Sequence, residues 1–502
     1  MNSQNASNDN SSIKESKKVD NFKNLFKKYF DAVIFLVNAI VFLVVGIPTI
    51  WRLTLLLDEA ILDILNALLL LSIPILMNVM AFFLLIGRKR SAITPLLILI
   101  FQGFLFSILM FVNLLFSILL GLNAVAAIFC VKKRPLLPRF KTKNGIIIPL
   151  LMIFIIISPV ALYFITTKAT ITLPAHTNPN FRVSFYCEFY NNDTFTNDHL
   201  TNLEAYNSRI FLAINESQIY NNSLAHNLTE RLNAANVRVY AWLLLDYSEG
   251  YWAADSNVLE FENLTSTFIA WAKANNLTYE GIMIDSEPSY QRLNAIQEQI
   301  GSFNIYGALM DLRRTATSGN HEFAKERYEA LVNSIQAQGY EAMVVGFPMP
   351  IDDLADGDDT LQQLMGVSTM PPYNWNYSSF MIYRSTYQDM IKVDFGSYMV
   401  YSYAKTTWNL FGTQSSISLA RSGQSPYSSL DEMKKDAFIV KNMGFNEVIW
   451  ISFERFDRQF GNTGLTELLG ALNESKSVSF NYNPFCGYSR FLFSFADSVN
   501  IL

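Results

Sequence analysis

Short apolar segments alternate with amphipathic helical segments after residue 182. Of all the features of the sequence, this alternation most narrows the folds that the chain can adopt. Eight segments have the length and composition of buried strands. They are 182–189, 209–214, 237–245, 280–286, 341–347, 380–385, 416–420 and 447–453. Eight strand–helix units in roughly 320 residues predict an α/β fold, a (β/α)₈ barrel of the TIM type. An open doubly wound sheet is the alternative, but no Gly-rich phosphate loop supports it.

The first third of the chain is far more apolar than the rest. Hydrophobic residues make up 51% of the sequence and charged residues 16%, and the apolar excess lies before about residue 167. Apolar runs cover 31–51, 60–87, 92–131 and 145–164, and the third is long enough for a helical hairpin. We therefore expect a disordered tail at 1–28, an all-α bundle of about five transmembrane helices at 29–167, and the barrel domain at 168–502.

Basic clusters suggest how such a bundle would be oriented. They precede the first run, follow the second and separate the fourth helix from the fifth. The positive-inside rule then predicts a multi-pass protein of the cell membrane with a cytoplasmic N-terminus and an exterior C-terminal domain. Four crossings, with the large domain inside, are the alternative.

Eight N-x-S/T triplets favour the exterior placement and are candidate glycosylation sites, because all of them follow the last apolar run. Their asparagines are Asn192, Asn215, Asn221, Asn227, Asn263, Asn276, Asn376 and Asn473.

Cysteine, histidine and charge usage exclude several classes of function. The four histidines are scattered, so we expect no metal site and no cofactor. A net charge of -5 argues against nucleic acid as a partner. Cys187 and Cys486 either form a disulfide between the first strand and the C-terminal segment or remain two free thiols.

The segment 279–288, YEGIMIDSEP, ends a predicted strand in two carboxylates. Because side chains alternate along a strand, Met283, Asp285 and Glu287 share one face. Burying two carboxyl groups on the inward face of a strand end is unfavourable in free energy, so their presence there indicates a functional role. In a barrel the C-terminal strand ends form the active face. The same inward phase adds Glu188, Trp242, Asp246, Tyr383, Trp450, Ser452 and Glu454 there.

Carboxylates among aromatic rings are the groups that a carbohydrate site requires. An acid protonates the glycosidic oxygen, and flat rings stack on pyranose faces. We therefore expect a carbohydrate partner. Trp450, Trp242, Asp246, Glu188 and Glu454 are the candidate substrate-binding residues.

The fourth strand resembles the motif D-G-x-D-x-D-x-E of family eighteen glycoside hydrolases, the chitinases and endo-N-acetylglucosaminidases. Gly281, Asp285 and Glu287 match it, whereas Met283 stands where the middle Asp belongs. FMIY at 380–383 is similar to the family's M-x-Y-D, with Arg384 in place of the final Asp. Val448 to Trp450 resembles the family's last strand, which ends in a sugar-stacking Trp. The resemblance covers the barrel alone and applies equally to a related barrel glycosidase family.

The resemblance implies catalytic roles for Glu287, Asp285 and Tyr383. Glu287 would be the general acid, Asp285 would orient the substrate's 2-acetamido group, and Tyr383 would hydrogen-bond that group. The other chemistry left open is two-carboxylate hydrolysis, with Glu454, Glu188 or Asp246 as nucleophile or base. The leading hypothesis is thus a membrane-anchored exterior glycoside hydrolase. The alternatives are a catalytically inactive carbohydrate-binding barrel and an active membrane bundle.

Overall fold

The computed structural model describes residues 169–491, apart from 222, 302–319, 370–373, 386–387, 389–393, 421–426, 428 and 488, together with short pieces between residues 30 and 128. The chain divides into two compact units. One comprises Met1–Trp51, Ile64–Tyr163 and Ser498–Leu502, and the other comprises Arg52–Asp63 and Phe164–Asp497.

Eight parallel strands close into a barrel in chain order, from β2 to β9, with β9 paired to β2. They are β2 (Arg182–Cys187), β3 (Arg209–Ile214), β4 (Arg238–Leu243), β5 (Gly281–Ser286), β6 (Glu341–Gly346), β7 (Tyr377–Met381), β8 (Ser415–Ala420) and β9 (Glu447–Ile451). The predicted barrel is confirmed. The sixth barrel strand, β7, starts earlier than predicted, so Tyr383 follows the strand end.

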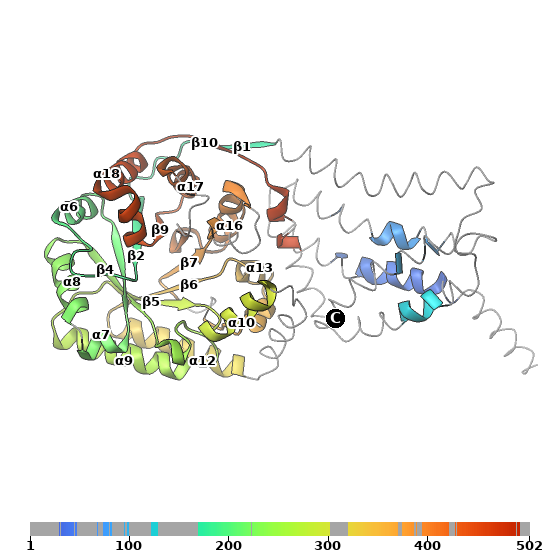
Figure 1. Ribbon diagram of the computed structural model, residues 1–502, viewed down its shortest axis with the longest axis horizontal. Coiled ribbons are helices and arrows are strands. Elements are labelled where there is room, and N and C mark those ends of the chain that lie inside the picture. The colour runs from blue at the N-terminus through green and yellow to red at the C-terminus, as the bar shows by residue number, and fades with distance from the viewer. Residues whose placement is uncertain are drawn as a thin grey trace, which may run out of the picture. The chain divides into compact units, whose positions relative to one another are not determined.

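Every barrel strand is followed by at least one helix, as expected for this fold. The α-helices are α6 (Asn197–Ala205), α7 (Glu216–Asn221), α8 (Ser223–Ala234), α9 (Val258–Ala274), α10 (Tyr290–Gly301), α12 (Asn320–Ala337), α13 (Pro350–Asp356), α14 (Thr360–Met365), α16 (Gly396–Phe411), α17 (Leu430–Asn442) and α18 (Phe453–Asn473). Figure 1 shows the strands at the centre of this unit with helices around them. Short 3₁₀ helices, η1 (Tyr247–Glu249) and η2 (Gly412–Gln414), follow β4 and precede β8.

The start of α17 shows how local sequence fixes a helix boundary. The Ser429 hydroxyl accepts the backbone N–H of Glu432 at 3.3 Å, which satisfies one of the amide groups left unpaired in the first turn. Gly444 follows the helix with a φ of 100°, a conformation that glycine adopts most easily. These two residues therefore mark the two ends of α17.

Side chains alternate between the barrel interior and the helix layer along β2. The Tyr186 ring contacts Phe211 and Trp242 of the next two strands inside the barrel. Phe185 points the other way and contacts Phe453 and Phe456 of α18. Glu188, two positions after Tyr186, therefore continues the inward face.

The N-terminal end of the barrel is filled by paired charges. Glu447 accepts hydrogen bonds from Arg182 at 3.0 Å and from the Ser184 hydroxyl at 2.6 Å, and Arg209 lies 3.7 Å away. Burial alone would raise the pKa of Glu447, but the charges of Arg209 and Arg182 lower it. Its carboxylate is therefore compensated and structural.

A second, two-stranded sheet joins distant parts of the chain outside the barrel. β1 (Thr170–Leu173) pairs antiparallel with β10 (Val478–Asn481). Helix α16 packs against it, because Tyr401 contacts Phe480 in β10 at 5.3 Å. The sequence patterns did not predict this sheet.

The predicted transmembrane bundle is not supported. In the described part of the chain, no helix has the length and apolar character needed to cross a membrane. The expectation rested on the length of apolar runs, whereas a crossing also requires one continuous helix of that length. The multi-pass location and the exterior placement of the barrel depended on those crossings and are withdrawn. The last apolar run, 145–164, lies outside the described residues.

The described pieces of the N-terminal unit contain a small apolar cluster. It comprises Ala32, Ile34, Phe35, Ala81, Ile98, Leu99 and Ala126. Next to these segments, the Asn38 side chain donates a buried hydrogen bond of 2.8 Å to the Asn123 side chain. A polar side chain in an apolar helix thus finds a partner for its donor group in another segment.

Candidate functional site

Asp285 and Glu287 lie at the C-terminal end of β5 and are almost fully buried, at 4% and 8% exposure. The loop after β4 fixes this strand end through Ala253. The Ala253 N–H donates to the Asp285 carbonyl at 2.8 Å, and the Ala253 carbonyl accepts from the Glu287 N–H at 3.2 Å. Backbone pairing therefore holds both acids on the inward face, as the strand alternation predicted.

The two carboxyl groups both have raised pKa values. Burial raises the pKa of both, and the nearby charge of Glu188 raises each further. The charge of Asp285 also raises the pKa of Glu287, whereas the contact with Glu287 lowers that of Asp285. The Trp242 indole also lowers the pKa of Asp285. The pKa of Asp285 is raised to about 8 and that of Glu287 well above its usual value, and the contact between them favours ionisation of Asp285 before Glu287.

Glu188 is the third carboxylate at this end of the barrel. It is partly exposed, and its Oε1 accepts a 2.7 Å hydrogen bond from the Tyr251 hydroxyl. Burial raises the pKa of Glu188, whereas the bond from Tyr251 lowers it. Glu188 thus raises the pKa values of the buried Asp285 and Glu287 and is itself accessible to solvent.

Tyr383 lies among the same charges. Burial raises its pKa well above the usual value, and the negative charges of Asp285, Glu287 and Glu188 add to the effect. The phenol therefore stays protonated and is available as a hydrogen-bond donor. Among the residues predicted as catalytic, the structure brings Glu287, Asp285 and Tyr383 together, as proposed from the sequence.

Trp242 reaches the site but not as a surface for stacking. It is buried, its ring packs against Tyr186 at 5.3 Å, and its indole acts on Asp285. Tyr186 in turn shares a 2.6 Å hydrogen bond with the Ser418 hydroxyl. Both rings form the floor beneath the carboxylates.

Trp450 does not lie at the site. The sequence pattern predicts its side chain on the inward face of the last strand, β9, but the structure places it on the outward face. It pairs in register with Phe185, whose ring contacts α18 on the outer face of the barrel. It is only 1% exposed and meets the Tyr427 ring edge-on at 5.1 Å. The next residue, Ile451, pairs with Tyr186 and takes the inward position. Sugar stacking on Trp450 is therefore ruled out in this fold.

Two further acids predicted at the site, Asp246 and Glu454, are not among the groups that act on Asp285 and Glu287. Asp246 is exposed to solvent at the start of η1. Glu454 lies in the first turn of α18 and accepts the backbone N–H of Phe189 at 2.8 Å, so it ties the end of β2 to that helix. Ser452 is buried just before that helix. Glu188 is therefore the strand-end acid, outside the β5 pair, that acts on Asp285 and Glu287.

The two positions that depart from the family-eighteen motif have structural explanations. Met283 is fully buried and pairs in register with Trp242 on one side and Met343 on the other. Arg384 donates to the Asp436 carboxylate at 2.6 Å and to Asp394 at 3.0 Å. Met283 therefore belongs to an apolar layer below Asp285, and Arg384 fastens the end of β7 to α17.

Sequence patterns missed Tyr251, whose role depends on a loop contact across the barrel mouth. The signal that was available is the aromatic density of 247–252, YSEGYW, directly after a strand. Aromatic residues in a loop at the active face are candidates for ligand contact.

Cys187 and Cys486 are both buried and form no disulfide, so the two-thiol alternative holds. Among the described residues, no group of three or more His, Cys, Asp or Glu could hold a metal ion. Among the sequon asparagines whose side chains the structure describes, five are exposed, namely Asn192, Asn227, Asn263, Asn276 and Asn473. The Asn376 Oδ1 instead accepts the Ala342 N–H at 2.8 Å, which disfavours a glycan there. Glycosylation at the exposed positions stays a prediction.

Comparison with known proteins adds nothing to the fold already described. No family model and no curated protein matches the chain. A glucosidase from Croceicoccus marinus is similar at 8% identity and a TM-score of 0.37, over 62% of this chain and 72% of that one. The HMG-CoA lyase from Brucella melitensis is similar at 10% identity and a TM-score of 0.30, over 62% and 96%. At these values the likenesses carry no information on activity, and the barrel is defined by its own strand order.

Proposed function

We propose that this chain is a glycoside hydrolase acting on a polysaccharide or glycan that contains N-acetylhexosamine, with Glu287 as the general acid. The observation that supports this most is the buried Asp285–Glu287 pair at the end of β5, in which burial raises the pKa of both carboxyl groups. A carboxyl group with a raised pKa is the donor needed to protonate a glycosidic oxygen near neutral pH. Tyr383 and Glu188 complete the polar surroundings.

In the first step, Glu287 gives its proton to the glycosidic oxygen as the bond from that oxygen to the anomeric carbon breaks. The carbonyl oxygen of the substrate's 2-acetamido group forms the new bond to the anomeric carbon. Asp285 accepts the amide N–H and stabilises the positive charge, while Tyr383 donates to the acetamido oxygen. In the second step, water attacks the anomeric carbon, loses a proton to the Glu287 carboxylate, and the cyclic intermediate opens. This is the substrate-assisted exception to the two-carboxylate scheme.

The second chemistry is direct two-carboxylate hydrolysis with Glu188 as nucleophile or base. The placement of the acids favours Glu188 over Asp246 and Glu454, because Glu188 acts electrostatically on Glu287 and the other two are held elsewhere. Analogues that lack the 2-acetamido group separate the two chemistries. Substrate-assisted cleavage requires that group, whereas cleavage by Glu188 does not.

The alternative of a catalytically inactive carbohydrate-binding barrel has less support in this structure. It rested on Met283 and Arg384 standing where aspartates are expected. Because Met283 fills an apolar layer and Arg384 pairs with Asp436, neither substitution by itself removes an acid that the proposed steps require.

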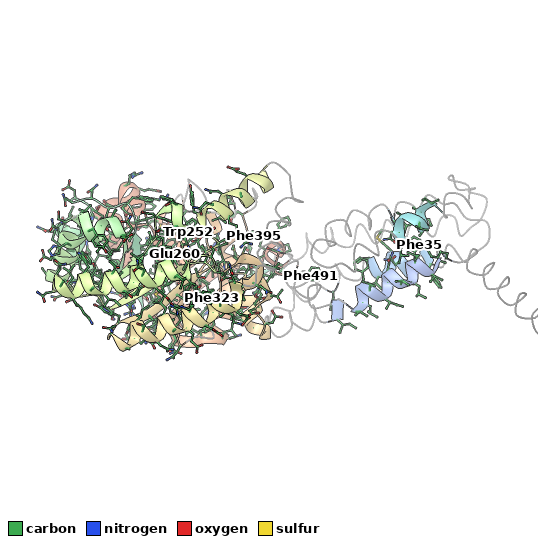
Figure 2. All side chains as sticks on the ribbon, turned by 90° about the horizontal axis from the view of Figure 1, so that it is seen from below. Phe35, Trp252, Glu260, Phe323, Phe395 and Phe491 are labelled. Carbon is green, nitrogen blue, oxygen red and sulfur yellow. The ribbon has the colours of Figure 1, made fainter. Side chains whose placement is uncertain are left out.

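The test measures reducing ends released from chito-oligosaccharides and N-glycans by the full-length chain and by Glu287→Gln. We expect Glu287→Gln to lose at least about a hundredfold in kcat, the usual contribution of a general acid. Glu260→Gln is the matched control, because Glu260 is an exposed glutamate in the first turn of α9, labelled in Figure 2. Equal turnover by wild type and Glu287→Gln would rule out the assignment.

A further inference from the structure

Four aromatic residues gather between β4 and the start of α10, and we call them the tyrosine platform: Tyr247, Tyr251, Trp252 and Tyr290. The rings of Tyr247 and Tyr251 stack with centroids 4.2 Å apart and planes 4° from parallel. Tyr290 meets Tyr247 at 4.8 Å and a steep angle, and Trp252 packs against both Tyr251 and Tyr290. The cluster is therefore one packed unit.

One ring of the platform is open to solvent. Tyr247 is 49% exposed, whereas Tyr251 beneath it is buried. Since Tyr251 covers one face of the Tyr247 ring, the exposure of Tyr247 belongs largely to the side turned away from Tyr251. A flat aromatic face in water, supported from behind by a parallel ring, is a preformed surface for stacking.

Side-chain hydrogen bonds and two residues of positive φ define the loop that carries the platform. The Asn257 side chain donates to the carbonyls of Glu249 at 3.0 Å and Trp252 at 2.8 Å, and so spans the turn. Tyr251 has a φ of 67°, a left-handed conformation that is rare for a residue with a bulky side chain. Gly250 has a φ of 110°, and a Cβ there would lie 2.6 Å from the Asn257 amide nitrogen. Such conformations persist only where surrounding contacts hold them, and they concentrate at ligand-binding sites.

The platform is continuous with the carboxylates, because Tyr251 lies under Tyr247 and hydrogen-bonds Glu188. We propose that the exposed face of Tyr247 binds the pyranose ring of an oligosaccharide unit whose neighbour occupies the carboxylate site. This inference rests on the proposed function and deepens it by identifying a second sugar-binding position. The C–H groups on one face of a pyranose are apolar and match the flat ring, while its hydroxyls remain in water.

The platform therefore selects chains over single sugars. A monosaccharide held by the carboxylates does not reach Tyr247, whereas a trisaccharide contacts both places. Because Tyr247 touches no reacting atom in this arrangement, its loss weakens binding and leaves the chemistry at Glu287 unaltered.

The experiment titrates triacetylchitotriose and cellotriose into the full-length chain carrying Glu287→Gln, which keeps the site closed to hydrolysis. Calorimetry with the added change Tyr247→Ala is expected to show about tenfold weaker binding, the upper range for one aromatic contact. Tyr247→Phe keeps the ring and is expected to bind within about twofold. Phe323→Ala is the control for loss of an exposed aromatic, because Phe323 on α12 is 51% exposed and lies apart from Trp252 in Figure 2.

Hydrolysis by chains with an intact Glu287 is measured in parallel to separate the two proposals. If chains with Tyr247 and with Tyr247→Ala bind the trisaccharides with equal affinity, Tyr247 is not a sugar-binding position. The proposed hydrolase would be unaffected by that result. Weakened binding by Tyr247→Ala without any hydrolysis by wild type would support the platform and refute the hydrolase. If neither trisaccharide binds at all, both proposals fail.

Discussion

Tyr251 donates its phenolic hydrogen to Glu188 over 2.7 Å and so joins the loop after β4 to the end of β2. The bond stabilises the charged form of Glu188 and opposes the effect of burial, which raises the pKa of that carboxyl. Glu188 in turn raises the pKa of Asp285 and of Glu287. One loop tyrosine therefore influences three carboxyl groups that come from two strands.

Tyr251→Phe keeps the stacked ring and removes this hydrogen bond. The pKa of Glu188 is expected to rise further, because burial is then less opposed. If Glu188 works in its ionised form, the acidic limb of the kcat/KM profile moves to higher pH. Hydrolysis of a chito-oligosaccharide between pH 4 and 9 measures the shift. Tyr290→Phe changes the same aromatic cluster without touching Glu188 and should leave the limb in place. An unmoved limb in Tyr251→Phe would contradict the coupling.

Glu287→Gln is expected to stabilise the fold at alkaline pH. The folded-state pKa of Glu287 lies above its unfolded value, so its favourable contribution is complete below the unfolded pKa, about 4.3, and is lost as pH rises through the raised pKa. The neutral amide escapes that loss, and we expect a gain of about 1 kcal/mol at pH 8 that shrinks toward pH 4. Thermal unfolding at both pH values checks it. A variant less stable than wild type at pH 8 would contradict the raised pKa of Glu287.

The barrel could be predicted because its signals are local: each strand is a short apolar run and each helix has its own boundary residues. Asp285 and Glu287 followed from strand alternation, which β5 keeps through its last residues. The prediction that Trp450 lies at the site was wrong because it assigned the wrong residues of β9 to the barrel interior. Ile451, not Trp450, faces inward, and an error of one residue along a strand turns every side chain to the opposite face. Tyr251 could not be found, since its position depends on an unusual backbone conformation and on a partner 63 residues away.

Arg384→Met should destabilise the fold by about 3 to 5 kcal/mol, the usual cost of leaving a buried charge without its partner. Asp436 is fully buried and accepts hydrogen bonds from both Arg384 and the Tyr427 hydroxyl. Chemical denaturation measures the loss. Adding Asp436→Asn removes the stranded charge and should recover much of the stability. If the single variant loses less than about 1 kcal/mol, the ion pair does not fasten β7 to α17.

Trp450→Ala and Tyr247→Ala should have opposite effects, because one residue is buried in the helix layer and the other is exposed at the platform. Removing the Trp450 side chain leaves a cavity beside Tyr427, and we expect a loss of about 3 to 5 kcal/mol in the free energy of unfolding. The folded fraction should still bind triacetylchitotriose with the wild-type Kd. Tyr247→Ala should change the free energy of unfolding by less than about 1 kcal/mol and weaken binding. Denaturation and calorimetry on the same samples separate the two. A Trp450→Ala chain that is stable but has lost its sugar affinity would place Trp450 at the site and overturn the observed phase of β9.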